Sequence, residues 1–104
     1  PLLVPATVVA EVGYLVAREA GARVGSMFLT ALADGDFQPV DLIAEDYRRA
    51  AELVQTYADL PLGTTDATVI ALAERLGLTE VATLDRRHFT VVRPQHVSAF
   101  TPLP

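Results

Sequence analysis

Residues 62–89, LGTTDATVIALAERLGLTEVATLDRRHF, contain the pattern that decides the fold of this chain. The first half predicts a helix over Asp66–Leu76, because Thr64 or Thr65 can cap its start and Gly77 stops it. The second half contains a short apolar run, residues 81–84, which is typical of a buried strand. Asp66 and Asp85 stand at the two ends of this helix–strand unit, so an otherwise apolar segment carries a carboxylate at each end.

Topology brings these two carboxylates to the same edge of a sheet. A helix that leads into a parallel strand runs antiparallel to that strand, so the helix start and the strand end lie at one edge. An 11-residue helix rises about 16 Å, and four strand residues with their approach cover about 13 Å or slightly more. Since the two lengths match, we expect Asp66 and Asp85 to meet at the carboxyl edge, where open α/β proteins bind ligands.

The rest of the chain also alternates strand and helix signals, which implies a parallel sheet covered by helices on its faces. In chain order, the sequence first predicts a strand over 2–4 and a helix that Pro5 and Thr7 open, that runs to about Ala20 and that stops at Gly21. A helix over 22–33, which ends at residues 34–36, a strand over 37–42 and a helix over 43–59 follow. The 66–76 helix, with Thr64 or Thr65 as its cap, the 81–84 strand and a short strand over 91–93 complete the prediction. Pro39 limits the 37–42 strand to an edge position, because proline has no N–H to donate.

Composition narrows the class of protein. The chain has 104 residues, 51% of them hydrophobic, which suits one ordered domain with one core. No apolar run is long enough to span a bilayer, so we expect no membrane association. Cysteine is absent, which excludes thiolate metal sites and fits a cytoplasmic protein. The net charge of −5 argues against a broad nucleic-acid-binding face, unless a divalent cation cancels a local cluster of acids.

A third carboxylate is expected near the first two. Glu11 lies about two turns into the helix that follows the opening strand, and its long side chain leans toward the helix N-terminus. Three converging carboxylates repel one another unless a cation lies among them. Carboxylate ligands suit Mg²⁺ or Mn²⁺, and such sites hydrolyse phosphodiesters by activating water. The sequence therefore predicts a Mg²⁺ or Mn²⁺ site formed by Glu11, Asp66 and Asp85.

Three segments resemble the PIN domain, most closely the VapC-type toxins of bacterial toxin–antitoxin pairs. They are VPATVVAEVGYLVAREAG, LPLGTTDATVIALAERLG and VATLDRRHF, and the resemblance covers essentially the whole chain. It implies an α/β fold, a PIN-like three-layer αβα sandwich around a mostly parallel sheet. It also implies a Mg²⁺- or Mn²⁺-dependent endoribonuclease that acts in the cytoplasm on RNA, is held inactive by a cognate antitoxin and is a homodimer.

The resemblance also carries over residue roles. By motif, Glu11, Asp66 and Asp85 correspond to three of the family's acidic residues, and Thr65 and Thr83 to the hydroxyls expected beside them. The family's first acidic residue, an aspartate that ends an N-terminal strand, has no counterpart in this chain. The resemblance thus implies that residues 1–104 form a single PIN-like domain that is N-terminally incomplete, lacks the first strand of the sheet, and is inactive by itself.

Each acidic residue also has a purely structural interpretation. Asp66 could be a first-turn acid favoured by the helix dipole, and Asp85 could open an Asx turn. The predicted metal site would be excluded only if the structural interpretations of Asp66 and Asp85 were both correct. Glu11 lies on an otherwise apolar helix face, which favours a functional role.

The basic and aromatic residues leave more alternatives open. Arg18 could pair with an antitoxin, an RNA phosphate or Glu19. Arg86 and Arg87 could hold RNA phosphates beside the metal or lie in a solvated turn. His88 is interpreted as structural, because a metal-bound water needs no histidine base. Three aromatic residues are interpreted as core rather than as platforms for stacked bases: Tyr14, Phe28 and Phe37.

Two other classes of protein share parts of the pattern. Phosphohydrolases and phosphoacceptor domains of the haloacid dehalogenase and receiver types also gather aspartates, but they place a lysine beside them, and this chain has no lysine. A non-catalytic binding domain that retains the PIN fold is the other alternative. Metal-dependent RNA cleavage distinguishes the predicted ribonuclease from both.

Overall fold

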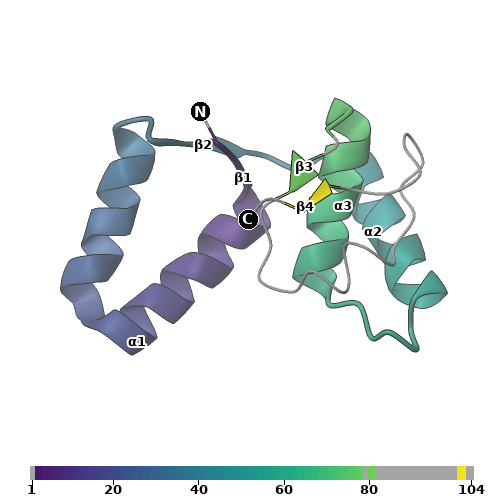
Figure 1. Cartoon of the computed structure of the whole chain (residues 1–104), viewed down its shortest axis with the longest axis horizontal. Coiled ribbons are helices and arrows are strands. Elements are labelled where there is room, and N and C mark those ends of the chain that lie inside the picture. The colour runs from purple at the N-terminus through teal and green to yellow at the C-terminus, as the bar shows by residue number, and fades with distance from the viewer. Residues whose placement is uncertain (1, 79, 82–100, 103–104) are drawn as a thin grey trace. The chain divides into compact units, whose positions relative to one another are not determined.

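The computed structural model of the chain describes residues 2–78, 80–81 and 101–102, which fall into two compact units, Pro1–Leu42 and Ile43–Pro104 (Figure 1). The first unit contains β1 (Leu2–Pro5), α1 (Ala6–Ala33) and β2 (Phe37–Val40). The second contains α2 (Ala44–Thr56), α3 (Thr64–Leu76), β3 (Glu80–Val81) and β4 (Thr101–Pro102). Within these residues, no helix combines the length and the apolar character needed to cross a membrane.

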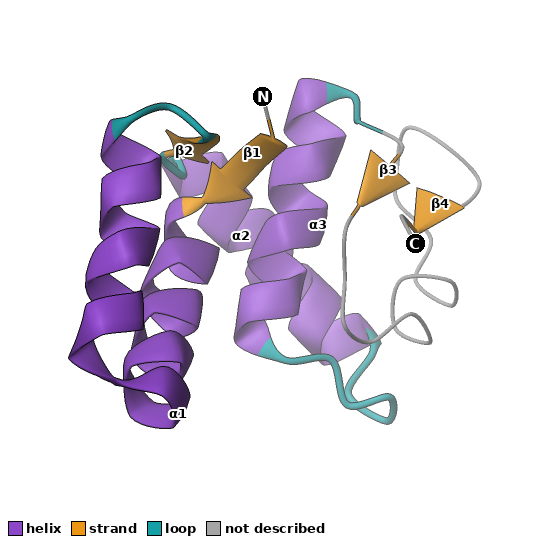
Figure 2. Ribbon diagram, turned by 60° about the vertical axis from the view of Figure 1, so that its left-hand side comes forward, coloured by secondary structure: helices purple, strands orange, loops and turns teal. Residues whose placement is uncertain are grey.

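The first unit is a parallel strand–helix–strand unit. β1 pairs with β2 in parallel, with Leu2 opposite Phe37 and Pro5 opposite Val40. Two parallel strands need a long crossover connection, and α1 supplies it (Figure 2). Both predicted strands are confirmed, although β2 ends at Val40, two residues before the predicted end.

Helix α1 consists of two arms that meet at Gly21. The backbone at Gly21 has φ 87° and ψ 175°, a conformation that is essentially restricted to glycine, and it interrupts the helical dihedrals there. The chain folds back at this point (Figure 1). A Cβ atom built on Gly25 would lie 3.5 Å from the Cβ of Ala17, and one built on Gly13 would lie 3.9 Å from Cε2 of Phe28. The two predicted helices separated by Gly21 are thus confirmed, and small residues let their arms pack closely.

We expect Gly21→Ala to lower the free energy of unfolding by about 1–3 kcal/mol, because alanine must adopt a backbone conformation that its Cβ disfavours. No atom lies within 4 Å of the position that this Cβ would occupy, so the cost is one of backbone strain alone. Gly25→Ala is the matched control. It should be neutral or stabilise by up to ~1 kcal/mol, because alanine favours helix. Chemical denaturation followed by circular dichroism measures both, and equal effects would contradict the role of Gly21.

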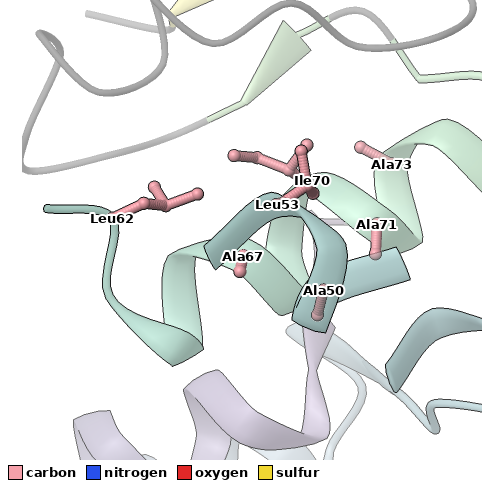
Figure 3. Packing of buried hydrophobic residues seen from close by; sticks show 7 residues of the cluster. All are labelled: Ala50, Leu53, Leu62, Ala67, Ile70, Ala71 and Ala73. Atoms are coloured by element: carbon pink, nitrogen blue, oxygen red, sulfur yellow. The ribbon is translucent and has the colours of Figure 1, made fainter. Parts of the chain in front are cut away.

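The core of the second unit lies between α2 and α3. It consists of seven residues (Figure 3), namely Ala50, Leu53, Leu62, Ala67, Ile70, Ala71 and Ala73. Ala67 and Ile70 are fully buried, so the face of α3 that carries them packs closely against α2 directly after the first turn of the helix. The predicted helices are confirmed, but α2 ends at Thr56, three residues before the predicted Asp59.

The sequence predicted the C-terminal end of α3 correctly but not its N-terminal cap. Gly77 closes the helix as predicted, with φ 69°, and the N–H of Leu78 donates to the carbonyl of Ala73 at 2.8 Å. The expected threonine cap is wrong. The N-cap is Gly63, in extended conformation and without a side-chain capping bond, so Thr64 and Thr65 are already helical.

A short parallel pair completes the second unit. β3 pairs with β4, with Glu80 opposite Thr101 and Val81 opposite Pro102. β3 overlaps the start of the predicted 81–84 strand, whereas residues 82–84 and the predicted 91–93 strand lie outside the described residues. The sequence did not predict β4. Every strand pair in the described part of the chain is parallel, as expected.

Candidate functional site

Asp66 is the third residue of α3, and it is the acidic residue of that helix's first turn. Its side chain is half-buried and directly precedes Ala67, which is fully buried. The N–H of Ala67 donates to the carbonyl of Gly63 at 3.0 Å, which closes the first helical turn around Asp66. The positive end of the helix dipole favours a negative charge at this position. The carboxylate is therefore held on a rigid, well-packed turn.

A buried threonine tightens the same turn. Thr68 is 6% exposed, and its hydroxyl donates to the carbonyl of Thr65 at 2.6 Å. Thr65, one of the predicted hydroxyl residues, is itself half-buried beside Asp66 in the sequence. Thr68 was not among the residues predicted from the sequence. The available signal was its position three residues after Thr65, where a threonine hydroxyl reaches a carbonyl of the preceding turn.

The other predicted site residues are distributed over the chain. Glu11 lies on the first arm of α1, in the first unit, and is exposed, whereas Asp66 belongs to the second unit. The remaining ones lie outside the described residues: Thr83, Asp85, Arg86, Arg87 and His88. Within residues 2–78, no group of three or more histidine or acidic side chains lies close enough together to hold a metal ion. The convergence of Glu11, Asp66 and Asp85 therefore stays a prediction.

Arg18 forms two contacts on the exposed side of α1. Its Nη2 atom lies 2.8 Å from Oε1 of Glu19, which is one of the three partners considered for it. Its guanidinium carbon lies 5.6 Å from the centroid of the Tyr14 ring. Tyr14 is 64% exposed, so its interpretation as a core residue is wrong. Its helical position places it outside the packed side of the arm.

The two phenylalanines of the first unit do pack as expected. Phe28 and Phe37 are half-buried, and their ring centroids lie 6.2 Å apart with the planes tilted by 44°. This contact joins the second arm of α1 to β2. It supports the interpretation of both residues as structural.

Two ion pairs that were not predicted from the sequence hold α2 against α3. Arg49 binds Glu74 through two bonds, Nε to Oε1 at 2.8 Å and Nη2 to Oε2 at 3.1 Å. Nε of Arg75 donates to Oδ1 of Asp46 at 2.9 Å, and the backbone N–H of Ile43 donates to Oδ2 of Asp46 at 3.0 Å. Asp46 is 2% exposed. These bonds hold fixed the helix that carries Asp66.

The pKa of Asp46 reflects a competition between burial and hydrogen bonding. Burial raises the pKa of the carboxyl, but the hydrogen bond from Arg75, the hydrogen bond from the Ile43 N–H and the charge of Arg75 together outweigh it. The net pKa lies below the ordinary aspartate value. A lowered folded-state pKa gives stability that is fully present above the unfolded pKa, near 4, and is lost as the pH falls through the folded pKa.

We expect Asp46→Ala to lower the free energy of unfolding by about 2–3 kcal/mol at pH 7. Removing one member of a buried pair costs about 3–5 kcal/mol, and water around the part-exposed Arg75 side chain reduces that cost. Below about pH 4 the gap between wild type and variant should narrow, because the wild-type carboxylate becomes protonated. Glu52→Ala, which removes an exposed partner 3.3 Å from Arg49, is the control and should cost at most ~1 kcal/mol. Urea unfolding at several pH values tests this, and a gap that is constant down to pH 2 would contradict it.

Comparisons with known proteins agree with the fold. Residues 1–93 match the family described as PIN domain. The chain is 38% identical over 103 residues to Ribonuclease VapC26 of Mycobacterium tuberculosis, an alignment that covers 99% of this chain and 76% of that protein. The crystal structure of M. tuberculosis VapC20, described as a sarcin–ricin-loop-cleaving toxin, matches with a TM-score of 0.74 at 19% identity, over 82% of this chain and 66% of that one. The PIN-like α/β class expected from the sequence is confirmed.

Proposed function

The chain belongs to the PIN domain family, and from that premise we propose that it is the endoribonuclease toxin of a toxin–antitoxin pair, which hydrolyses phosphodiester bonds within RNA. The observation that carries the proposal is the 38% identity to Ribonuclease VapC26 over 99% of this chain. At that identity, with nearly the full chain aligned, the two proteins share a fold, and the proposal extends this to the reaction. The structural likeness to VapC20 supports the fold alone, because only 19% of the residues are identical.

The proposed cofactor is Mg²⁺ or Mn²⁺, held by Glu11, Asp66 and Asp85. The donor set fits such an ion, since it consists of carboxylate oxygens and the chain has no cysteine that would select a softer metal. Asp66 also lies on a closed helical turn, which gives its carboxylate the defined position that a metal ligand needs. When bound, a divalent ion in a carboxylate site lowers the pKa of a water molecule and stabilises the leaving oxygen.

The roles of the protein groups follow from their chemistry. Asp66 is proposed as a ligand oriented by α3, whose position the Asp46 and Glu74 ion pairs maintain. The Thr65 and Thr83 hydroxyls are proposed to hydrogen-bond substrate or water beside the carboxylates. Arg86 and Arg87 are proposed to neutralise RNA phosphates next to the cleaved bond, a contact that positions RNA without reading its sequence.

The proposed partners are RNA, a cognate antitoxin and a second copy of the chain, in the cytoplasm. The 38% identity to Ribonuclease VapC26 supports an antitoxin partner, because the VapC-type toxins that the sequence resembles are held inactive by a cognate antitoxin. Large exposed apolar side chains on α1, such as Met27 at 60% and Leu29 at 59%, offer area for protein contacts. The assays use the complete encoded protein.

The test is to incubate the complete protein with long structured RNA and Mg²⁺ or Mn²⁺ and to map the ends of the products. Cuts within the RNA chain are expected. Hydrolysis restricted to small phosphoesters would instead indicate the phosphohydrolase class. RNA that is bound and left intact would indicate a non-catalytic binding domain.

A further inference from the structure

We infer that Tyr14 and Arg18 form a platform for single-stranded RNA beside the cleavage site, with Tyr14 stacking on a base next to the cut and Arg18 contacting a phosphate. This inference rests on the proposed function, and it names residues that position the substrate in that same site.

The helical register places this platform beside a proposed metal ligand. Glu11, Tyr14 and Arg18 are separated by three and then four residues, so they share one side of the first arm of α1. All three side chains are exposed. Tyr14 stands about 4.5 Å along the helix axis from Glu11, and Arg18 stands about 10.5 Å from it. A strand whose phosphate is cut at Glu11 can therefore reach both residues with its neighbouring nucleotides.

The packing of α1 leaves this side of the arm open within the first unit. The first arm approaches the second through Gly13 and Ala17, which lie close to Phe28 and Gly25. Because successive helical residues are rotated by about 100°, the side that carries Glu11, Tyr14 and Arg18 differs from the packed one. Tyr14 thus contributes little to holding the arms together, and at 64% exposure its side chain is accessible to a ligand.

The contacts of the Tyr14–Arg18 pair suit a single strand of RNA. The Arg18 guanidinium lies 5.6 Å from the Tyr14 ring centroid, so an aromatic face and a cation are presented together. Proteins bind single-stranded RNA through this combination, with bases stacked on aromatic rings and arginine planes and phosphates held by charge. The competing ion pair with Glu19 is exposed at both partners, 56% and 69%, so a phosphate can replace it at small cost.

The distribution of charge in the first unit points the same way. Arg18 and Arg23 are the basic residues of segment 1–42, and they flank the Gly21 bend. Three of the acidic residues of that segment follow the second arm instead: Asp34, Asp36 and Asp41. An RNA strand that leaves the metal site along the first arm therefore moves toward the cations and away from these acids.

The first test is Tyr14→Ala in the complete protein. Loss of one stacked base should raise KM for RNA roughly 5- to 20-fold, with kcat within about twofold of wild type. Tyr14→Phe should rescue binding because it keeps the ring, whereas Tyr14→Leu, which keeps apolar area without a ring, should behave like Tyr14→Ala. Tyr47→Ala, at an exposed tyrosine of α2, is the matched control and should leave KM unchanged.

A second test concerns the charge of Arg18. Arg18→Gln should reduce the slope of log Kd against log salt concentration by about 0.7, the value expected when one phosphate contact to a single strand is lost. The Kd is measured with uncut RNA on protein that carries Asp66→Asn, so binding is read without cleavage. Thermal melting checks that each variant is folded.

The outcomes separate this inference from the proposed function. A complete protein that cuts no RNA overturns the proposed function. A protein that cuts RNA while Tyr14→Ala and Tyr14→Leu keep the wild-type KM overturns the platform alone. Equal binding by Tyr14→Phe, Tyr14→Leu and wild type would assign Tyr14 to apolar contacts, and a loss of dimer or antitoxin binding with unchanged RNA binding would assign it to a protein interface. Each of these results contradicts the inference.

Discussion

Asp66→Asn should reduce the rate of RNA cleavage by the complete protein about 100-fold or more. Asparagine keeps the size and hydrogen-bonding capacity of the side chain but removes the charge that a divalent cation needs. Removal of a single group that stabilises the transition state commonly costs 100- to 1,000-fold in rate. Asp85→Asn and Glu11→Gln should act in the same direction, since all three residues are proposed ligands. Single-turnover cleavage of a labelled RNA measures the effect.

The same variant should stay folded. Like charges repel where carboxylates crowd together, so without metal the Asp66→Asn protein should be as stable as wild type or slightly more stable. Asp59→Asn is the matched control. Asp59 is exposed in the segment that follows α2, and its variant should keep full activity. Full ribonuclease activity of the Asp66→Asn protein would remove Asp66 from the site, as would a large loss of stability with unchanged catalysis.

Removal of divalent metal should abolish cleavage, and re-addition of Mg²⁺ or Mn²⁺ should restore it. Activation of water and stabilisation of the leaving oxygen both depend on the ion in a carboxylate site. The folded protein should also melt at a higher temperature with metal, because a ligand that binds the folded state alone stabilises it by about 2.7 kcal/mol at 100 times its Kd. Differential scanning fluorimetry with and without chelator measures this shift independently of activity.

Asp66→Asn also controls the metal experiment. The variant should lose most of the metal-dependent rise in melting temperature, because one ligand is gone. Asp59→Asn should keep it. Cleavage that survives exhaustive chelation would defeat the metal-hydrolase mechanism, and a melting shift that is unchanged in the Asp66→Asn protein would place the ion elsewhere.

The elements of the fold could be predicted well because their signals are local. Gly21 and Gly77 adopt backbone conformations that favour glycine, and each ends a helix where the sequence indicated. Apolar spacing predicted α2, and the stop at Gly77 predicted the end of α3; these two helices form the core of the second unit. Cap positions were less predictable. Thr64 and Thr65 have the chemistry of an N-cap, but Gly63, in extended conformation, takes that role.

At the candidate site too, positions set by local signals could be predicted from the sequence, whereas the exposure of side chains could not. The sequence identified Asp66 as a first-turn residue of a helix, and the structure confirms this position. The environment of Tyr14 could not be predicted, because apolar spacing alone does not tell a buried aromatic from an exposed one on a helix with two different sides. The exposure of Tyr14 excludes its interpretation as a core residue, whereas its contact with RNA is a proposal.

By itself, the sequence determined the parallel strand–helix–strand order, the break at Gly21, and the family to which the chain belongs, since each depends on residues that are close together in the chain or on a contiguous motif. Only the tertiary structure decided how α3 is fastened. Arg49 meets Glu74 across 25 residues and Arg75 meets Asp46 across 29. Asp46 lies on the buried side of α2 with Ala50 and Leu53. The sequence could not identify its partner, because several arginines were available, and the packing angle and register of the two helices, which no local pattern encodes, selected Arg75.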